Sequence, residues 1–142
     1  MEENEKNGFT VEVYDPNKHY GVEEFCNIID NPGFAGAIRR NLERENPYPF
    51  LIAAHDGKMV GWTGPMYNEP TGRGHLDGIC VDPNIRGCGL GKALFCTLCE
   101  YSKEHGAKYM TFFTGLDNPA RRIYLFAGFK IAQSFADMKK DL

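Results

Sequence analysis

The pattern of apolar and polar residues predicts that the chain opens with one strand and two helices. Residues 9–14 (FTVEVY) alternate apolar and polar positions, as a strand with one buried face does. Apolar side chains then recur at roughly helical spacing over 17–30, and the sequence NPG at 31–33 interrupts that pattern. A second helix is therefore expected from Phe34 to about Glu45.

The middle of the chain is dominated by strand patterns. The segments PFLIAAH (49–55) and MVGWTGPMY (59–67) are separated by Asp-Gly-Lys, and this arrangement predicts a β-hairpin. A polar turn over 69–74 then leads to HLDGICV (75–81), which has the length and composition of a further strand. Three strands are therefore expected between the second helix and the glycine-rich segment that follows.

The second half of the chain alternates helices with strands. An apolar stripe at helical spacing follows the glycine-rich segment, and Gly106 ends it. Beyond it the pattern predicts a strand over 108–115, a helix over 118–127 with Asn118 as its N-cap, and one or two strands over 129–139. Strand–helix–strand units after a hairpin are typical of an α/β fold with a mixed sheet flanked by helices.

The size and charge of the chain narrow the classes of function. A chain of 142 residues suits one domain, expected to span 1–142, and its net charge of −3 does not supply the basic surface that nucleic acid or an anionic membrane requires. The N-terminal sequence lacks the pattern of a secretory signal, and the longest apolar run, 50–54, is too short to cross a bilayer. A cytoplasmic monomer or homodimer that binds neither nucleic acid nor membrane is therefore expected.

The five cysteines favour reduced thiols over a disulfide framework or a metal site. Their number is odd and their spacing matches no disulfide framework. Cys96 and Cys99 form a CxxC motif, but it lies inside a predicted helix, whereas a redox thiolate is stabilised at a helix N-terminus. No second pair of ligands accompanies them, so no metal is expected.

The segment VDPNIRGCGLGKAL (81–94) carries the strongest functional signal in the sequence. Three glycines at alternate positions let backbone N–H groups approach an anion at a helix N-terminus, and Arg86 and Lys92 add positive charge on either side. The segment lacks the first glycine and the hydroxyl of a P-loop, and its glycines do not match the GxGxxG dinucleotide pattern. A pyrophosphate site is favoured over a turn that is rich in glycine for packing alone.

Two motifs resemble those of one family. The segment with Arg86, Gly89 and Gly91 resembles [Q/R]xxGx[G/A], the acetyl-CoA signature of the GNAT N-acetyltransferase superfamily. The segment NPARRIYLFAGF (118–129) resembles the family's later motif, with Asn, Ala-Arg, Tyr and Gly-Phe in order. The resemblance implies a single-domain α/β GNAT fold, with a mixed, mostly antiparallel sheet of about six to seven strands flanked by about four helices.

The resemblance also implies a binding mode for acetyl-CoA, as co-substrate and without a metal. Backbone amides of the glycine-rich segment would hold the pyrophosphate, and the strand that precedes it would hydrogen-bond the pantetheine arm. A backbone N–H near Val81 would stabilise the oxyanion formed during acyl transfer. The residues expected to bind the cofactor are Ile79, Cys80, Val81, Arg86, Gly87, Cys88, Gly89, Leu90, Gly91, Lys92 and Asn118.

The same resemblance suggests the acid and the base of a direct transfer from acetyl-CoA to an amine. Tyr124 matches the family's tyrosine, which commonly protonates the departing thiolate; the alternative is a tyrosine packed in the core. Asp77 shares the parity of Ile79 on the predicted strand and is the first candidate for the base, unless it only binds substrate. His75 lies on that parity too and is the second candidate.

The acceptor is the least defined part of the expected reaction. A primary amine of a small molecule is the first hypothesis, a peptide or protein amine the second, and an acetyl-CoA sensor without turnover the third. The residues expected to contact the acceptor are Phe34, Trp62 and His75. Core packing is the alternative for the two aromatic side chains among them.

Overall fold

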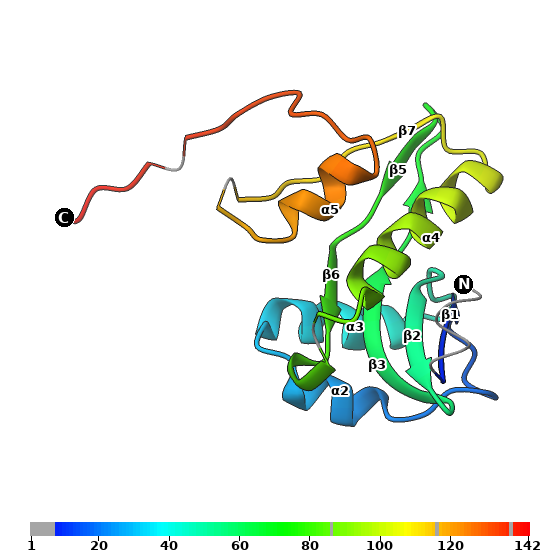
Figure 1. Cartoon of the computed structure of the whole chain (residues 1–142). Coiled ribbons are helices and arrows are strands. Elements are labelled where there is room, and N and C mark those ends of the chain that lie inside the picture. The colour runs from blue at the N-terminus through cyan, green and yellow to red at the C-terminus, as the bar shows by residue number, and fades with distance from the viewer. Residues whose placement is uncertain (1–7, 86, 116, 137) are drawn as a thin grey trace.

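The computed structural model describes residues 8–85, 87–115, 117–136 and 138–142. Within these residues the chain forms seven strands and four α-helices (Figure 1). In chain order they are β1 (Phe9–Val13), α2 (Val22–Ile28), α3 (Pro32–Leu42), β2 (Leu51–His55), β3 (Lys58–Gly64), β4 (Tyr67–Asn68), β5 (Arg73–His75), β6 (Gly78–Val81), the 3₁₀ turn η1 (Pro83–Ile85), α4 (Leu90–Glu104), β7 (Tyr109–Met110) and α5 (Arg121–Phe126).

The strands form two sheets. The larger has the order β1-β2-β3-β6 and is antiparallel throughout, whereas the smaller has the order β4-β5-β7 and contains the parallel pair β5–β7. The expected mixed, mostly antiparallel α/β architecture is confirmed. The single strand expected over 75–81 is wrong, because the chain leaves the smaller sheet after His75 and enters the larger one at Gly78.

The predicted hairpin forms through the Asp-Gly turn. Asp56 and Gly57 both have positive φ, 51° and 83°, which is the conformation of a two-residue turn that matches the twist of the flanking strands. The four residues Leu51–Ala54 are all buried, because the larger sheet is covered by helices on both faces. This explains why β2 reads as a continuous apolar run without alternation.

Two hydrophobic clusters hold these layers together. On one face of the larger sheet, helices α2 and α3 bury Phe25 and Ile38 against Trp62. On the other face, α4 buries Leu94, Phe95 and Leu98 against β1 and β2. Gly61 of β3 permits this close approach, since a Cβ there would lie 2.9 Å from Leu94 Cδ1 and 3.1 Å from Ala53 Cβ.

A loop around the buried His19 takes the place of the first turn of the helix expected over 17–30. His19 is 5% exposed; its Nδ1 accepts a hydrogen bond from the Asp15 amide at 2.9 Å, and its Nε2 lies 2.8 Å from Glu12 Oε1. Lys18 pairs with the other carboxylate oxygen of Glu12 at 2.7 Å. These contacts hold residues 15–20 as a loop, so that α2 begins only at Val22.

The C-terminal third departs most from the sequence pattern. The strand expected over 108–115 is limited to the two residues of β7, and no strand forms in the described parts of 129–139. Beyond α5 the chain leads away from the two sheets (Figure 1). A strand requires a neighbour to bond its backbone, and β7 has only β5 beside it in the described structure.

The last helix is shorter than its pattern. The helix expected over 118–127 is observed as α5, with Ala120 as its N-cap. Asn118 still stabilises the segment that leads into the helix, because its Oδ1 accepts a hydrogen bond from the Ala120 amide at 2.9 Å. No helix of the described chain is both long and apolar enough to cross a membrane.

We predict that Leu94 contributes strongly to the packing of α4 against the larger sheet. Because it is fully buried, Leu94→Ala should lower the free energy of unfolding by about 2–5 kcal/mol, through lost burial and the cavity left behind. Chemical denaturation measures the change. Leu125→Ala is the matched control: this side chain is 49% exposed, and a change within about 0.5 kcal/mol is expected. Equal effects of the two substitutions would contradict the packing described for α4.

Candidate functional site

The outer edge of β6 is free to bond a ligand backbone. β6 pairs with β3 on one side only, and no described strand lies on its other side. The Asp82 amide donates to Val60 O at 2.8 Å, so the hydrogen-bonded positions of this ladder are those of Asp82, Cys80 and Gly78. The alternate residues, Ile79 and Val81, therefore present their N–H and C=O groups to the free edge.

The glycine-rich segment brings exposed amides to the start of α4. Gly87 and Gly89 have φ of 90° and 83°, a backbone region that residues with a Cβ rarely adopt, and apart from their chain neighbours no atom of the described residues lies within 4 Å of where a Cβ would stand on either. Gly89 is the N-cap of α4, and no side-chain hydrogen bond from the described residues caps the helix. Within the described residues the first amides of this 15-residue helix thus have no side-chain acceptor, which suits an anion.

Other residues expected at this site are placed less simply. The Lys92 ammonium lies 3.5 Å from the centre of the Phe126 ring of α5, so its charge is already engaged with an aromatic face. The Cys88 thiol donates to Ile85 O at 2.9 Å and is exposed. Leu90 is buried, so only its backbone is available to a ligand. Arg86 lies outside the described residues.

Gly91 lies where α5 packs against the start of α4, and Asn118 lies in the segment that leads into α5. A Cβ on Gly91 would lie 3.4 Å from Ile123 Cδ1, so the absence of a side chain lets α5 approach the first turn of α4. Asn118 is exposed, and its Nδ2 donates to Thr114 Oγ1 at 3.1 Å.

Tyr124 lies in an aromatic cluster under α5. It is 7% exposed, and its ring centre lies 4.9 Å from that of Phe95 and 4.5 Å from that of Phe112. Burial raises the pKa of its hydroxyl, which therefore keeps its proton to a higher pH than an exposed tyrosine does. The packing role and the role of proton donor are compatible, because the first uses the ring and the second the hydroxyl.

Asp77 and His75 lie at the place where the chain changes sheets. Asp77 is exposed and stands between β5 and β6, so the premise that it continues a strand with Ile79 is wrong. Its amide donates to Gly64 O at 3.1 Å, which fixes the backbone at the break. His75 is the last residue of β5, and its Nε2 lies 2.9 Å from Glu69 Oε1.

Phe34 and Trp62 lie one over the other between α3 and the larger sheet, with ring centres 5.6 Å apart. Trp62 is 0% exposed and belongs to the core, so it does not line an open surface as expected for an acceptor pocket. Its Nε1 is the one buried side-chain nitrogen or oxygen in the described structure that has no hydrogen-bond partner. Phe34 is half-buried and covers Gly78, where a Cβ would overlap the Phe34 ring.

Sequence reasoning missed two features of this region. One is the need for glycine at position 78, which only the position of Phe34 explains. The other is the Glu69–His75 pair, although the signal was present: the two residues flank the polar turn over 69–74, and a turn of that length brings its ends together.

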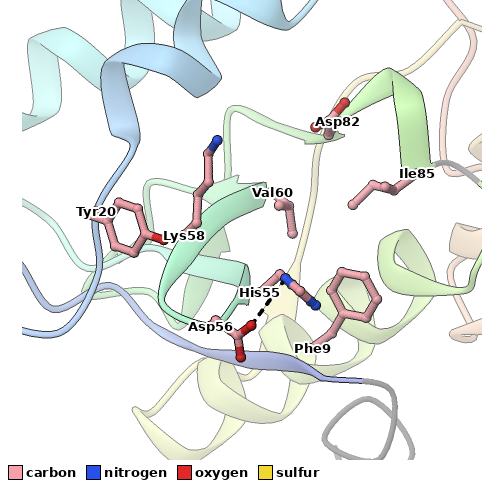
Figure 2. Close-up of a pocket in the computed structure, with 8 residues that line it drawn as sticks. All are labelled: Phe9, Tyr20, His55, Asp56, Lys58, Val60, Asp82 and Ile85. Atoms are coloured by element: carbon pink, nitrogen blue, oxygen red, sulfur yellow. Dashed lines mark ion pairs between the residues drawn. The ribbon is translucent and has the colours of Figure 1, made fainter.

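A surface hollow lies elsewhere, beside the turn of the β2–β3 hairpin (Figure 2). It measures about 370 Å³, and Figure 2 shows His55 directed toward Asp56 at its rim, with a separation of 3.6 Å. None of the residues predicted for the site lines this hollow. Its lining residues are Phe9, Tyr20, His55, Asp56, Lys58, Val60, Asp82 and Ile85.

The cysteines are free thiols, as expected. Cys99 of the CxxC motif is half-buried on α4, and burial raises the pKa of its thiol to about 11. It is therefore a protonated, unreactive thiol at neutral pH, which does not suit a redox role.

Comparisons with known sequences point in one direction. Glucosamine 6-phosphate N-acetyltransferase from Trypanosoma brucei brucei is 42% identical over 90 residues, which are 58% of this chain and 54% of that protein. Mycothiol acetyltransferase from Cellulomonas flavigena is 32% identical over 94 residues, which are 59% of this chain and 27% of that protein. The chain thus spans about half or less of these two relatives.

Comparisons with solved structures extend the likeness to nearly the whole fold. A Trypanosoma brucei acetyltransferase has a TM-score of 0.64 at 22% identity, over 94% of this chain and 99% of that one. An aminoglycoside N-acetyltransferase in complex with CoA has a TM-score of 0.66 at 17% identity, over 94% and 95%. The model of the acetyltransferase (GNAT) family matches residues 10–129, a range that contains the four described helices and, apart from Phe9, both sheets, and the chain belongs to that family.

Proposed function

We propose that the protein transfers an acetyl group from acetyl-CoA to the primary amine of a small molecule. The observation that carries the proposal is the free edge of β6 running directly into the uncapped N-terminus of α4. One surface thereby offers a ladder of backbone groups for an extended amide arm and a cluster of amides for a pyrophosphate. Coenzyme A contains both chemical groups, in that order, from its thiol end.

Each part of the cofactor finds a fitting group in the chain. The amides that follow Gly87 and Gly89 would hold the pyrophosphate, with the helix dipole of α4 favouring its charge. The outward groups of Ile79 and Val81 would bond the pantetheine arm as a neighbouring strand does. This placement brings the thioester to the N-terminal end of β6, next to the break at Asp77.

The chain supplies groups for the transfer itself. In a ternary complex the amine attacks the thioester carbonyl, a C–N bond forms, and the C–S bond then breaks. The outward amide of Ile79, which is the one nearest the proposed thioester, would donate to the developing oxyanion, rather than that of Val81 at the other end of β6. Tyr124 would give its proton to the departing thiolate, and the carboxylate of Asp77 would face the ammonium of the acceptor before attack.

Two relatives favour a small acceptor over a peptide. They are named as a glucosamine 6-phosphate N-acetyltransferase and a mycothiol acetyltransferase, and both names refer to small molecules. In the described chain, aromatic side chains and a histidine lie near the break in the strand, including Tyr67 and His75. Such side chains suit the apolar face and the hydroxyls of a sugar ring. An amino sugar or a related polar amine is the proposed acceptor class.

Residues 1–142 are proposed to form one domain.

An assay of CoA release against a panel of acceptors tests the proposal. The panel contains amino sugars, their phosphates, polyamines and short peptides with free N-termini. We expect turnover with small polar amines and none with peptides. Turnover with peptides alone would replace the proposal with a peptide acetyltransferase. Binding of acetyl-CoA without turnover on any acceptor would replace it with a sensor.

Gly89→Val tests the cofactor site. Acetyl-CoA that binds only the folded protein raises Tm by mass action, and this rise is measured by thermal unfolding. A branched side chain resists positive φ and blocks the amides, so we expect the variant to lose the rise. Gly106→Val at the other end of α4 is the matched control: its φ is 96° with open space around it, so it carries the same strain but keeps the rise. A normal rise in Gly89→Val would place the pyrophosphate elsewhere.

Tyr124→Phe and Asp77→Asn test the two catalytic assignments. Loss of the phenolic proton should lower kcat by ~10²–10⁴-fold and leave the affinity for acetyl-CoA unchanged. Because burial raises the pKa of Tyr124, the proton is present throughout the range between about pH 7 and pH 9, and the loss of kcat should be constant across it.

Asp77→Asn should raise KM for the amine by about 5-fold with kcat retained, as expected for an exposed charge that binds an ammonium. A fall in kcat that alkaline pH restores would instead make Asp77 the base.

A further inference from the structure

The Glu69–His75 pair has no assigned step in the transfer so far, although the sequence makes His75 the second candidate for the base. His75 ends β5, and Glu69 lies in the turn that joins β4 to β5, so the pair spans a short antiparallel hairpin. The imidazole Nε2 lies 2.9 Å from Glu69 Oε1, and the His75 side chain is 17% exposed. The pair is thus shielded from solvent on most of its surface and still has an opening to it.

Two contacts fix the orientation of the imidazole. The Tyr67 ring stacks on it with centres 4.7 Å apart and planes within 9°, and the Tyr48 ring lies 5.2 Å from that of Tyr67. A carboxylate only accepts hydrogen bonds, so Nε2 carries the proton of the pair. In the neutral ring Nδ1 then has the free lone pair, which is the state that a general base requires.

The charged surroundings favour this arrangement. The pKa of the Glu69 carboxyl lies below its ordinary value, first because it accepts the hydrogen bond from His75 and also because of the charge of Arg73. Thr71 Oγ1 approaches the other oxygen of Glu69 at 3.4 Å. Arg73 is itself held by Thr111, with Nε donating to Oγ1 at 2.6 Å. The titratable or charged groups on this face are therefore Glu69, Arg73 and Tyr67, with Asp77 at the break beyond His75.

The position of His75 places the pair beside the proposed reaction. His75 is separated by Leu76 and Asp77 from the first residue of β6, whose free edge would hold the thioester. Arg73 and His75 project to one face of β5 and Gly74 to the other, where a Cβ would lie 3.2 Å from Cγ of Met110 in β7, a residue that packs against the cluster formed by α4. The imidazole thus lies on the face of β5 opposite that cluster.

We propose that His75 is the general base of the transfer and that Glu69 is the positioning residue that holds it in the competent tautomer. The proposal rests on the proposed function. Nδ1 takes one proton from the acceptor ammonium, which frees the nitrogen lone pair to attack the thioester. The imidazolium is stabilised by Glu69 and returns its proton to solvent. The thiolate takes its proton from Tyr124, and the second proton that the attacking nitrogen loses restores the Tyr124 hydroxyl. The sum is one amide, one thiol and one proton released.

A structural role for the pair predicts different behaviour. If Glu69 and His75 only clamp β4 to β5, their substitution lowers stability and acts on kcat and KM alike at every pH. A base held by a positioning residue gives a fall in kcat with KM for acetyl-CoA unchanged. It also makes the two residues act as one unit, so that the second substitution adds nothing to the first.

The experiment combines Glu69→Gln, His75→Ala and the double variant on the intact chain. We expect His75→Ala to lower kcat by ~10²–10⁴-fold. Glu69→Gln should lower it about 10- to 100-fold, the range for loss of one charge-assisted hydrogen bond. The double variant should match His75→Ala, and added imidazole should restore part of the kcat of His75→Ala. Nitrogen NMR of the imidazole should show protonated Nε2 and bare Nδ1 in the unaltered protein, and a mixture of tautomers in Glu69→Gln.

Matched controls separate this role from general effects of removing a carboxylate. Asp56→Asn alters the exposed pair of His55 and Asp56 and should leave kcat unchanged. Glu12→Gln alters the buried contact with His19 and should lower Tm without changing kcat. Additive losses in the double variant, or an unchanged kcat in Glu69→Gln, would overturn the proposal while acetyl transfer itself stands. Absence of turnover with every amine would overturn the proposed function and this inference together.

Discussion

The site depends on a change of strand pairing between His75 and Gly78. Between His75 and Gly78 the backbone leaves a sheet in which it pairs with β7 and enters one in which it pairs with β3. Backbone groups that have no strand beside them must find other partners, and here they line the outer edge of β6. The same change exposes Asp77 and sets His75 at the end of its strand. The groups proposed for binding and for chemistry thus meet at one place because the sheets part there.

Helices on both faces of the larger sheet hold the segment at which the two sheets separate. α4 packs its apolar face against the larger sheet through Leu94, Phe95 and Leu98, and it can come close because β3 has Gly61 at the contact. This packing fixes the direction of the helix axis and therefore the point at which its first amides emerge. On the opposite face, Phe34 rests on Gly78 and Trp62, which ties α3 to the first residue of β6. Both ends of the free edge are thereby held by buried side chains.

The different roles proposed for four polar side chains follow from differences in their environments. Tyr124 is buried among aromatic rings, and its raised pKa preserves a proton for donation. His75 is held between a carboxylate and a stacked ring, which is suited to receiving a proton in a defined orientation. Asp77 is exposed at the break, where it can meet a cation arriving from solvent. Glu69 has no direct role and acts through its hydrogen bond.

The sequence by itself determined the features that depend on nearby residues. The Asp-Gly turn, the apolar run of β2 and the glycine-rich entry to α4 were all predicted, because positive φ and short apolar runs are local properties of the sequence. The family and the two motifs were found for the same reason, since each motif is a short stretch of backbone geometry. Tertiary structure decided the rest. HLDGICV has the pattern of one strand, and only the positions of β3 and β7 divide it in two. The apolar residues over 129–139 have a strand pattern, but without a neighbouring strand their described part forms none. Trp62 became core and not pocket because α3 covers it, and Glu69 found His75 because the β4–β5 turn closes. In each case the outcome depended on a partner distant in sequence or on the closing of a chain segment, which local pattern does not encode.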